Sequence, residues 1–116
     1  MEISYKDRSE FLRGFLILIR KDKIITIEER TMALIIGNYL GFAKDFCTES
    51  LDNLLKNEYI SEEPPLFSNS IIANYFVRES FRIVDQIHIL GEKEIRWLTK
   101  TAKDNNCCSD FLSFRK

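Results

Sequence analysis

The sequence has few of the residues that mark several common classes of protein. Its 116 residues include only four glycines and two prolines, whereas 45% are hydrophobic and 30% are charged. So little glycine and proline excludes a collagen-like or linker composition, and this mixture of apolar and charged residues excludes a disordered chain. A chain of this length is typical of one domain around one core. We therefore expect residues 1–116 to form a single domain.

The sequence also lacks an excess of one charge and a long apolar run. Its 17 basic and 18 acidic side chains give a net charge of −1, which does not favour nucleic acid or an anionic membrane as a partner. The longest apolar run, Phe15–Ile19, is far shorter than the roughly 18 residues that span a bilayer. The charged start, Met1-Glu2-Ile3, does not resemble a signal peptide. We expect a cytoplasmic protein that neither binds nucleic acid nor inserts into a membrane.

Cysteine and histidine are too scarce to indicate a disulfide framework, a zinc site or a catalytic triad. The three cysteines, Cys47, Cys107 and Cys108, are odd in number and lack zinc spacing, so we expect free thiols. His88 falls in a predicted turn, and we interpret it as a turn residue rather than a ligand or proton acceptor. No Ser-His-Asp or Cys-His arrangement is recognisable. We therefore predict that the chain is not an enzyme.

What the sequence does contain is helical periodicity. Apolar residues recur at i, i+3, i+4 and i+7, and no segment alternates as a strand would. One such stripe, expected to face the core, comprises Met32, Ile35, Ile36, Tyr39 and Leu40. The predicted helices are Tyr5–Lys21, Ile27–Phe42, a shorter one from Asp45 or Thr48 to Asn57, Ser70–Val84, and Glu92–Asp104, with a weaker one around Phe111, Leu112 and Phe114. The first helix is apolar enough to be buried on most sides.

The segment between the third and fourth helices is expected to be a loop. Pro65 disfavours a helical conformation at Pro64, and Leu66 and Phe67 are expected to anchor this loop to the core. The predicted fold is therefore an all-α, single-domain bundle of five to seven helices, in which two helical hairpins flank a shorter helix.

The turns of the two hairpins carry similar acidic motifs. Asp22-Lys-Ile-Ile-Thr-Ile-Glu-Glu29 follows the first helix, and Asp85-Gln-Ile-His-Ile-Leu-Gly-Glu92 precedes Trp97-Leu98. These motifs resemble the Asp-Gly-x-Ile-x-x-x-Glu turns of the TerB-like (tellurite-resistance protein B) helical family, with Lys23 and Gln86 in place of the two glycines. The connection Asn57–Ser68 is similar to that of an uncharacterised bacterial branch of the family. The resemblance covers roughly residues 8–105. It implies a TerB-like bundle and a metal- or partner-binding role in bacterial stress response, without an established enzymatic activity.

Carboxylates in these turns are candidate metal ligands. If the hairpins are related by a pseudo-twofold axis, the turns bring together Asp22, Glu29, Asp85, and Glu92 or Glu94. Clustered carboxylates suit a divalent cation, Ca²⁺ or Mg²⁺, although neither turn has the ligand pattern of an EF-hand loop. In the alternative interpretation, Glu29 and Glu94 cap their helices from position N3, and the aspartates lie in solvated turns.

One face of the fifth helix is a candidate surface for binding a partner. Helical spacing places Lys93, Arg96, Lys100 and Lys103 on one side, with Trp97 at its border. Residues 45–63 hold six acidic side chains against one lysine. The stripe is either an ordinary solvated face or a docking face for an acidic protein partner or a second copy of the chain.

The residues predict a non-enzymatic helical interaction module, and the resemblance implies a response to a divalent metal and a place in bacterial stress response. The alternative is a metal-dependent enzyme, a hydrolase, that uses the carboxylates of the two turns. That alternative requires an open metal position beside a substrate pocket near Asp22 and Asp85.

Overall fold

Five α-helices make up the regular structure of the computed structural model, which describes residues 3–21, 25–56, 61–87 and 89–107. They are α1 (Tyr5–Ile19), α2 (Ile27–Tyr39), α3 (Lys44–Lys56), α4 (Ser70–Ile87) and α5 (Glu92–Asp104). No strand occurs in the part of the chain that the structure describes, so the predicted all-α fold is confirmed. The sixth helix predicted around Phe111 lies outside the described residues, as do Asp22, His88 and Cys108.

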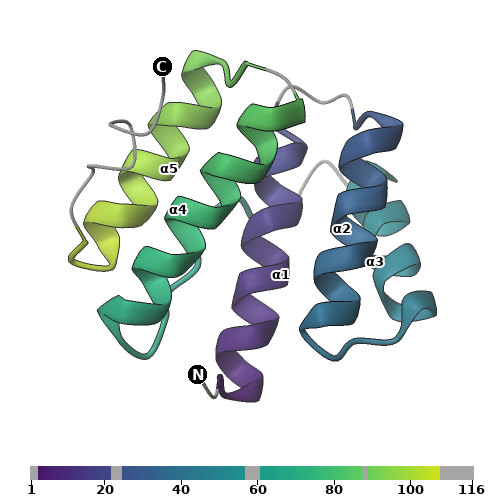
Figure 1. The fold of residues 1–116 in the computed structure, drawn as a ribbon, viewed down its shortest axis with the longest axis horizontal. Helices are drawn as coiled ribbons and strands as arrows, with labels where there is room; N and C mark the ends of the chain where they lie inside the picture. Colours follow the sequence, from purple (N-terminus) through teal and green to yellow (C-terminus); the bar gives the residue numbers. More distant parts are fainter. Residues whose placement is uncertain (1–2, 22–24, 57–60, 88, 108–116) are drawn as a thin grey trace.

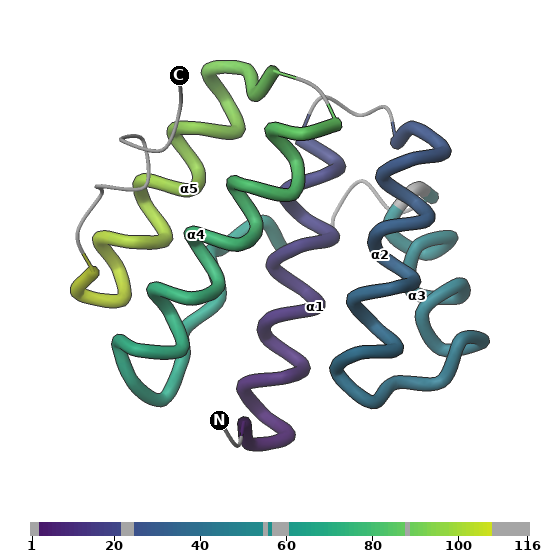
Figure 2. Tube along the Cα trace, in the orientation of Figure 1, coloured from purple at the N-terminus to yellow at the C-terminus, as the bar shows by residue number. Residues whose placement is uncertain are grey.

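α1 is the central helix, and it forms one hairpin with α2, while α4 and α5 form the other (Figure 1). The predicted shorter helix between the hairpins is wrong: α3 has 13 residues, as many as α2 and α5, and it lies at the edge of the bundle because it packs against α2. α1 contacts α2, α4 and α5, and α3 packs against α2 on the side away from α5 (Figures 1 and 2). The apolar run Phe15–Ile19 is buried throughout, as expected for a helix surrounded by others. Among the helices described, none is both long enough and apolar enough to cross a membrane.

Side-chain caps explain where the helices begin. The Ser4 hydroxyl accepts a hydrogen bond from the Asp7 N–H at the start of α1. At α2, Thr26 accepts from the Glu29 N–H while the Glu29 carboxylate accepts from the Thr26 N–H, which forms a complete capping box.

Five boundaries differ from prediction. α1 and α2 end two and three residues earlier, and α4 extends three residues beyond Val84. α3 begins at Lys44, before the predicted Asp45 or Thr48, and ends at Lys56, one residue before Asn57.

The predicted inward stripe of α2 is partly wrong. Ile36 and Leu40 are buried, but Ile35 and Tyr39 are exposed. The reason is that α2 packs against both α1 and α3, which turns Ala33 and Gly37 inward instead. A Cβ atom on Gly37 would lie 2.2 Å from Cys47 Sγ, so this close contact with α3 requires glycine.

Candidate functional site

Residues 61–69, which follow α3 and precede α4 in the chain, form an extended strap across the bundle. It confirms the predicted loop, and both Pro64 and Pro65 are buried. A Cβ atom on Gly14 would lie 2.7 Å from Pro65 Cγ, which shows how closely the strap approaches α1. The anchoring prediction holds for Phe67, whose ring packs against Phe11 and Phe76, but is wrong for Leu66, which is exposed.

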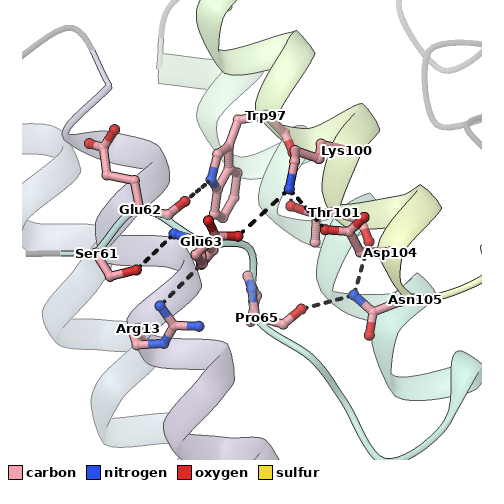
Figure 3. Close-up of polar contacts among 10 residues, drawn as sticks. All are labelled: Arg13, Ser61, Glu62, Glu63, Pro65, Trp97, Lys100, Thr101, Asp104 and Asn105. Carbon is pink, nitrogen blue, oxygen red and sulfur yellow. Dashed lines mark hydrogen bonds and ion pairs between the residues drawn. The ribbon is translucent and has the colours of Figure 1, made fainter.

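Hydrogen bonds from two helices hold the strap backbone (Figure 3). Arg13 on α1 donates to the Glu63 carbonyl at 3.1 Å, and the Trp97 indole on α5 donates to the Glu62 carbonyl at 2.8 Å. Asn105 donates to the Pro65 carbonyl at 2.9 Å and accepts from the Phe67 N–H at 2.9 Å. These bonds fix the strap backbone, and with it Glu62 and Glu63, beside α5.

Buried Asp7 holds the far end of the strap. Its carboxylate accepts hydrogen bonds from the Ser68 N–H and hydroxyl and from the Ser4 hydroxyl. Burial alone would raise the pKa of Asp7, but the hydrogen bonds from Ser68 and Ser4 together outweigh it and lower that pKa below its ordinary value. A lowered carboxyl pKa stabilises the fold above the unfolded-state pKa, and this contribution is lost as pH falls through the folded-state pKa.

Most of the residues of the predicted basic face line a depression beside α5. Its volume is about 360 Å³, and it is lined by Lys21, Glu62, Lys93, Arg96, Trp97 and Lys100. The Glu62 carboxylate is 3.0 Å from Lys21 Nζ and 3.8 Å from Arg20 Nη2. Lys21 Nζ also lies 5.7 Å from the centre of the Trp97 ring. We call this feature the basic depression.

The predicted partner-binding residues occupy different positions in and around it. Lys93, Arg96 and Lys100 are exposed and line the depression, whereas Lys103 is exposed but does not line it. Arg96 pairs with Glu92 on its own helix. Lys100 pairs with Asp104 at 3.2 Å and with Glu63 at 3.7 Å, and the bond to Asp104 is the main reason that its pKa is raised.

Trp97 is a core residue rather than an exposed anchor. It is 6% exposed, and its ring meets Phe76 edge to face. Sequence reasoning placed Trp97 at the border of the basic stripe, but it missed Lys21 and Glu62 because they belong to α1's end and to the strap. The sequence offered one signal for Glu62: it belongs to the acidic segment 45–63, whose charge is opposite to that of the basic stripe.

The predicted metal ligands are divided between caps and surface positions. α1 and α4 end, and α2 and α5 begin, at the same end of the bundle, as a shared site would require (Figure 1). However, Glu29 is fully buried and caps α2, and Glu94 accepts from the Gly91 N–H at 2.7 Å and caps α5. Glu92 is exposed beside Arg96. The capping interpretation of Glu29 and Glu94 is therefore confirmed.

Asp85 lies on the last turn of α4. It borders a depression of about 380 Å³ whose lining comes from α4 alone and includes Arg78, Glu79 and Arg82. Within the described ranges, no group of three His, Cys, Asp or Glu side chains could hold a metal ion. Asp22 lies outside those ranges, so a divalent-cation site that includes it stays a prediction.

An apolar groove, which the sequence did not reveal, lies between α2 and α4. It has a volume of about 500 Å³; Phe11, Ile36 and Leu40 are its buried residues. Tyr39 from α2 and Tyr75 from α4 both line it. Burial raises the pKa of Tyr75, as do the neighbouring Tyr39 and Glu79. The available signal was the excess of apolar residues on α2, where Ile27, Ile35 and Tyr39 add to the residues that the core uses.

Comparisons with known proteins identify no relative. No family model matches the chain, and no significant match was found among curated proteins or solved structures. The features from which a function can be inferred are therefore the basic depression, the capping glutamates and the apolar groove.

Replacing Glu29 with alanine tests whether this residue acts as a cap or as a ligand. We expect a loss of about 0.5–1.5 kcal/mol in the free energy of unfolding, because the half-buried N–H of Thr26, the N-cap residue of α2, loses its acceptor. Denaturant melts with and without a chelator should give the same loss. Glu92→Ala, at an exposed position, is the matched control and should change stability little. Chelator-sensitive stability in the parent that disappears in Glu29→Ala would instead make Glu29 a metal ligand.

Proposed function

We propose that the chain is a non-enzymatic interaction module that binds an acidic segment of a partner protein in the basic depression. The observation that carries this proposal is the lining itself, which combines four cations with one carboxylate beside the largely buried Trp97. A concave surface with an excess of one charge concentrates the field and speeds the approach of the opposite charge.

The side chains of the strap support the choice of a carboxylate-bearing partner. Glu62 already occupies part of the depression, where two cations from the end of α1 contact its carboxylate. Of the other lining cations, Lys100 pairs with Asp104 and Glu63, and Arg96 pairs with Glu92, all of them exposed residues. The Arg96–Glu92 pair joins two exposed residues one turn apart, an arrangement that contributes little to stability. An incoming carboxylate can therefore exchange with these pairs at small cost.

The biological setting depends on the resemblance to TerB-like proteins. That resemblance supports an interaction module of bacterial stress response, in the cytoplasm, and it is the source of the divalent-cation hypothesis. The hydrolase alternative has no supporting observation among the described residues, because Glu29 and Glu94 accept hydrogen bonds from their own helix starts.

Binding of a short oligoglutamate peptide tests the proposal. Trp97, the single tryptophan, reports binding through its fluorescence. We expect saturable binding that weakens about tenfold between about 50 and 300 mM salt, since screening over a Debye length of about 8–10 Å acts directly on these exposed charges. The double substitution Arg96→Glu with Lys100→Glu should abolish binding and leave the helical circular dichroism unchanged.

The matched control reverses two exposed lysines at the ends of α3, on the other side of the bundle. Lys44→Glu with Lys56→Glu changes the net charge equally but leaves the depression intact, and it should retain most of the affinity. If both double variants lose the same affinity, peptide binding depends only on net charge. That result, or no saturable binding by the parent, would contradict the proposal.

A further inference from the structure

The apolar groove carries an inference that is independent of the basic depression. Two residues of α2, Ile35 and Tyr39, are 56% and 77% exposed, and two of α4, Ile71 and Tyr75, are 69% and 36% exposed. Ile71 precedes Tyr75 by one helical turn, so the two lie on the same side of α4. We call these four residues, together with the groove between them, the α2–α4 face. We infer that this face is the interface through which two copies of the chain associate.

The area of the face matches what a stable dimer needs. Taking roughly 150–200 Å² for each fully exposed side chain of this size, the four residues expose roughly 400 Å². A standard interface buries about 800 Å² on each partner, of which a little more than half is apolar. The α2–α4 face therefore supplies nearly all the apolar area of one such interface. Its size is that of the largest apolar patch on a typical monomer, a patch that is often functional.

The charges on and near the face favour a second copy of the same chain as its occupant. Glu79 is the charged residue of the groove lining, and the Arg82 guanidinium pairs with it through two hydrogen bonds of 2.8 and 3.0 Å. Closing one face on another thus buries no unpaired charge at this position. The net charge of −1 gives two copies little long-range repulsion.

The shape of the face is compatible with twofold symmetry. Ile35 and Tyr39 are the exposed residues that α2 contributes to the groove lining, and Phe11 and Ile36 are buried parts of the same lining. We take the two exposed side chains as the raised edge of the groove. A twofold axis places the raised edge of each copy against the groove of the other, which closes the assembly at two subunits. The tyrosines suit such a position because they combine a large apolar ring with a hydroxyl that bonds at the rim.

Analytical ultracentrifugation of the full chain, from about 1 to 500 µM, tests this inference. We expect the weight-average mass to rise from 13.7 kDa toward twice that value, with half of the chain dimeric at roughly 10–100 µM. Ile35→Lys should weaken association at least about 30-fold, since it places a charge at the centre of the apolar contact. Its circular dichroism and melting midpoint should stay close to those of the parent because the side chain is largely exposed.

Ile89→Lys is the matched control. Ile89 is 80% exposed in the turn between α4 and α5, and it does not line the groove. This variant should dimerise as the parent does. A parent that stays at 13.7 kDa at every concentration overturns the inference, and so does equal dimerisation of the two variants, which would assign the contact to another surface. Ile35→Lys should bind the oligoglutamate peptide normally, so this inference and the proposed function can fail separately.

Discussion

Replacing Gly37 with alanine is expected to lower the free energy of unfolding by about 2–3 kcal/mol, although alanine favours helix over glycine by about 1 kcal/mol. The added Cβ would lie 2.2 Å from Cys47 Sγ, far inside the separation of about 3.5–4 Å at which carbon and sulfur atoms attract. Cys47 has a single side-chain torsion and is buried, so rotating its sulfur moves it against other core atoms. Either α2 and α3 separate or the core around Cys47 is compressed. Urea melts followed by circular dichroism measure the loss.

A second substitution shows whether this contact is the cause. In a Cys47→Ala background the sulfur is gone, and the next contact of the new Cβ is with the Cβ of residue 47 at 3.5 Å, an ordinary distance. Gly37→Ala should then be neutral or stabilising by up to about 1 kcal/mol, which gives a coupling of about 3 kcal/mol between the two positions. If Gly37→Ala costs the same with cysteine and with alanine at position 47, the steric explanation is wrong.

The sequence predicted those parts of the fold that local patterns determine. The apolar run Phe15–Ile19 placed a helix at the centre of the bundle, since a helix that is hydrophobic on all sides needs neighbours on all sides. Thr26 and Glu29 marked the start of α2 because their hydrogen bonds join residues only three apart. Such interactions join residues that are close in the sequence, so the sequence alone predicts them.

The sequence did not predict features that depend on how many neighbours cover a helix. The apolar spacing of α2 identified a stripe, but it could not show that α3 would pack beside Gly37 and leave Ile35 and Tyr39 exposed. The apolar groove follows from that arrangement, so the excess of apolar residues on α2 could not by itself locate it.

The basic face of α5 was predicted only in part for a related reason. Helical arithmetic correctly put Lys93, Arg96 and Lys100 on one side. The Trp97 indole, however, reaches a carbonyl 35 residues away in the strap, and this contact brings carboxylates beside the lysines. A pairing over that sequence distance is set by tertiary packing, which composition and periodicity do not encode.

The position of Trp97 in the core leads to the other large effect that we expect, on Trp97→Ala. This substitution should cost about 3–5 kcal/mol, the usual range for removing a large buried aromatic side chain. The loss is a large fraction of the 5–15 kcal/mol that stabilises a typical domain. A tryptophan held on the surface for a partner would cost far less, so the size of the effect distinguishes the two roles.

Trp97→Phe separates packing from hydrogen bonding at the same position. Phenylalanine can keep the edge-to-face contact with Phe76 but loses the indole N–H that donates to the Glu62 carbonyl. Because Glu62 is exposed, water can replace the lost donor. The lost hydrogen bond should therefore lower the free energy of unfolding by about 1 kcal/mol, and the smaller phenylalanine ring adds the loss of some packing contacts. Arg96→Ala, at the exposed neighbouring residue, should change stability by less than about 0.5 kcal/mol. Circular dichroism follows all three melts without needing the indole, and a Trp97→Ala loss below about 1 kcal/mol would return Trp97 to the surface role that its place beside the basic stripe first indicated.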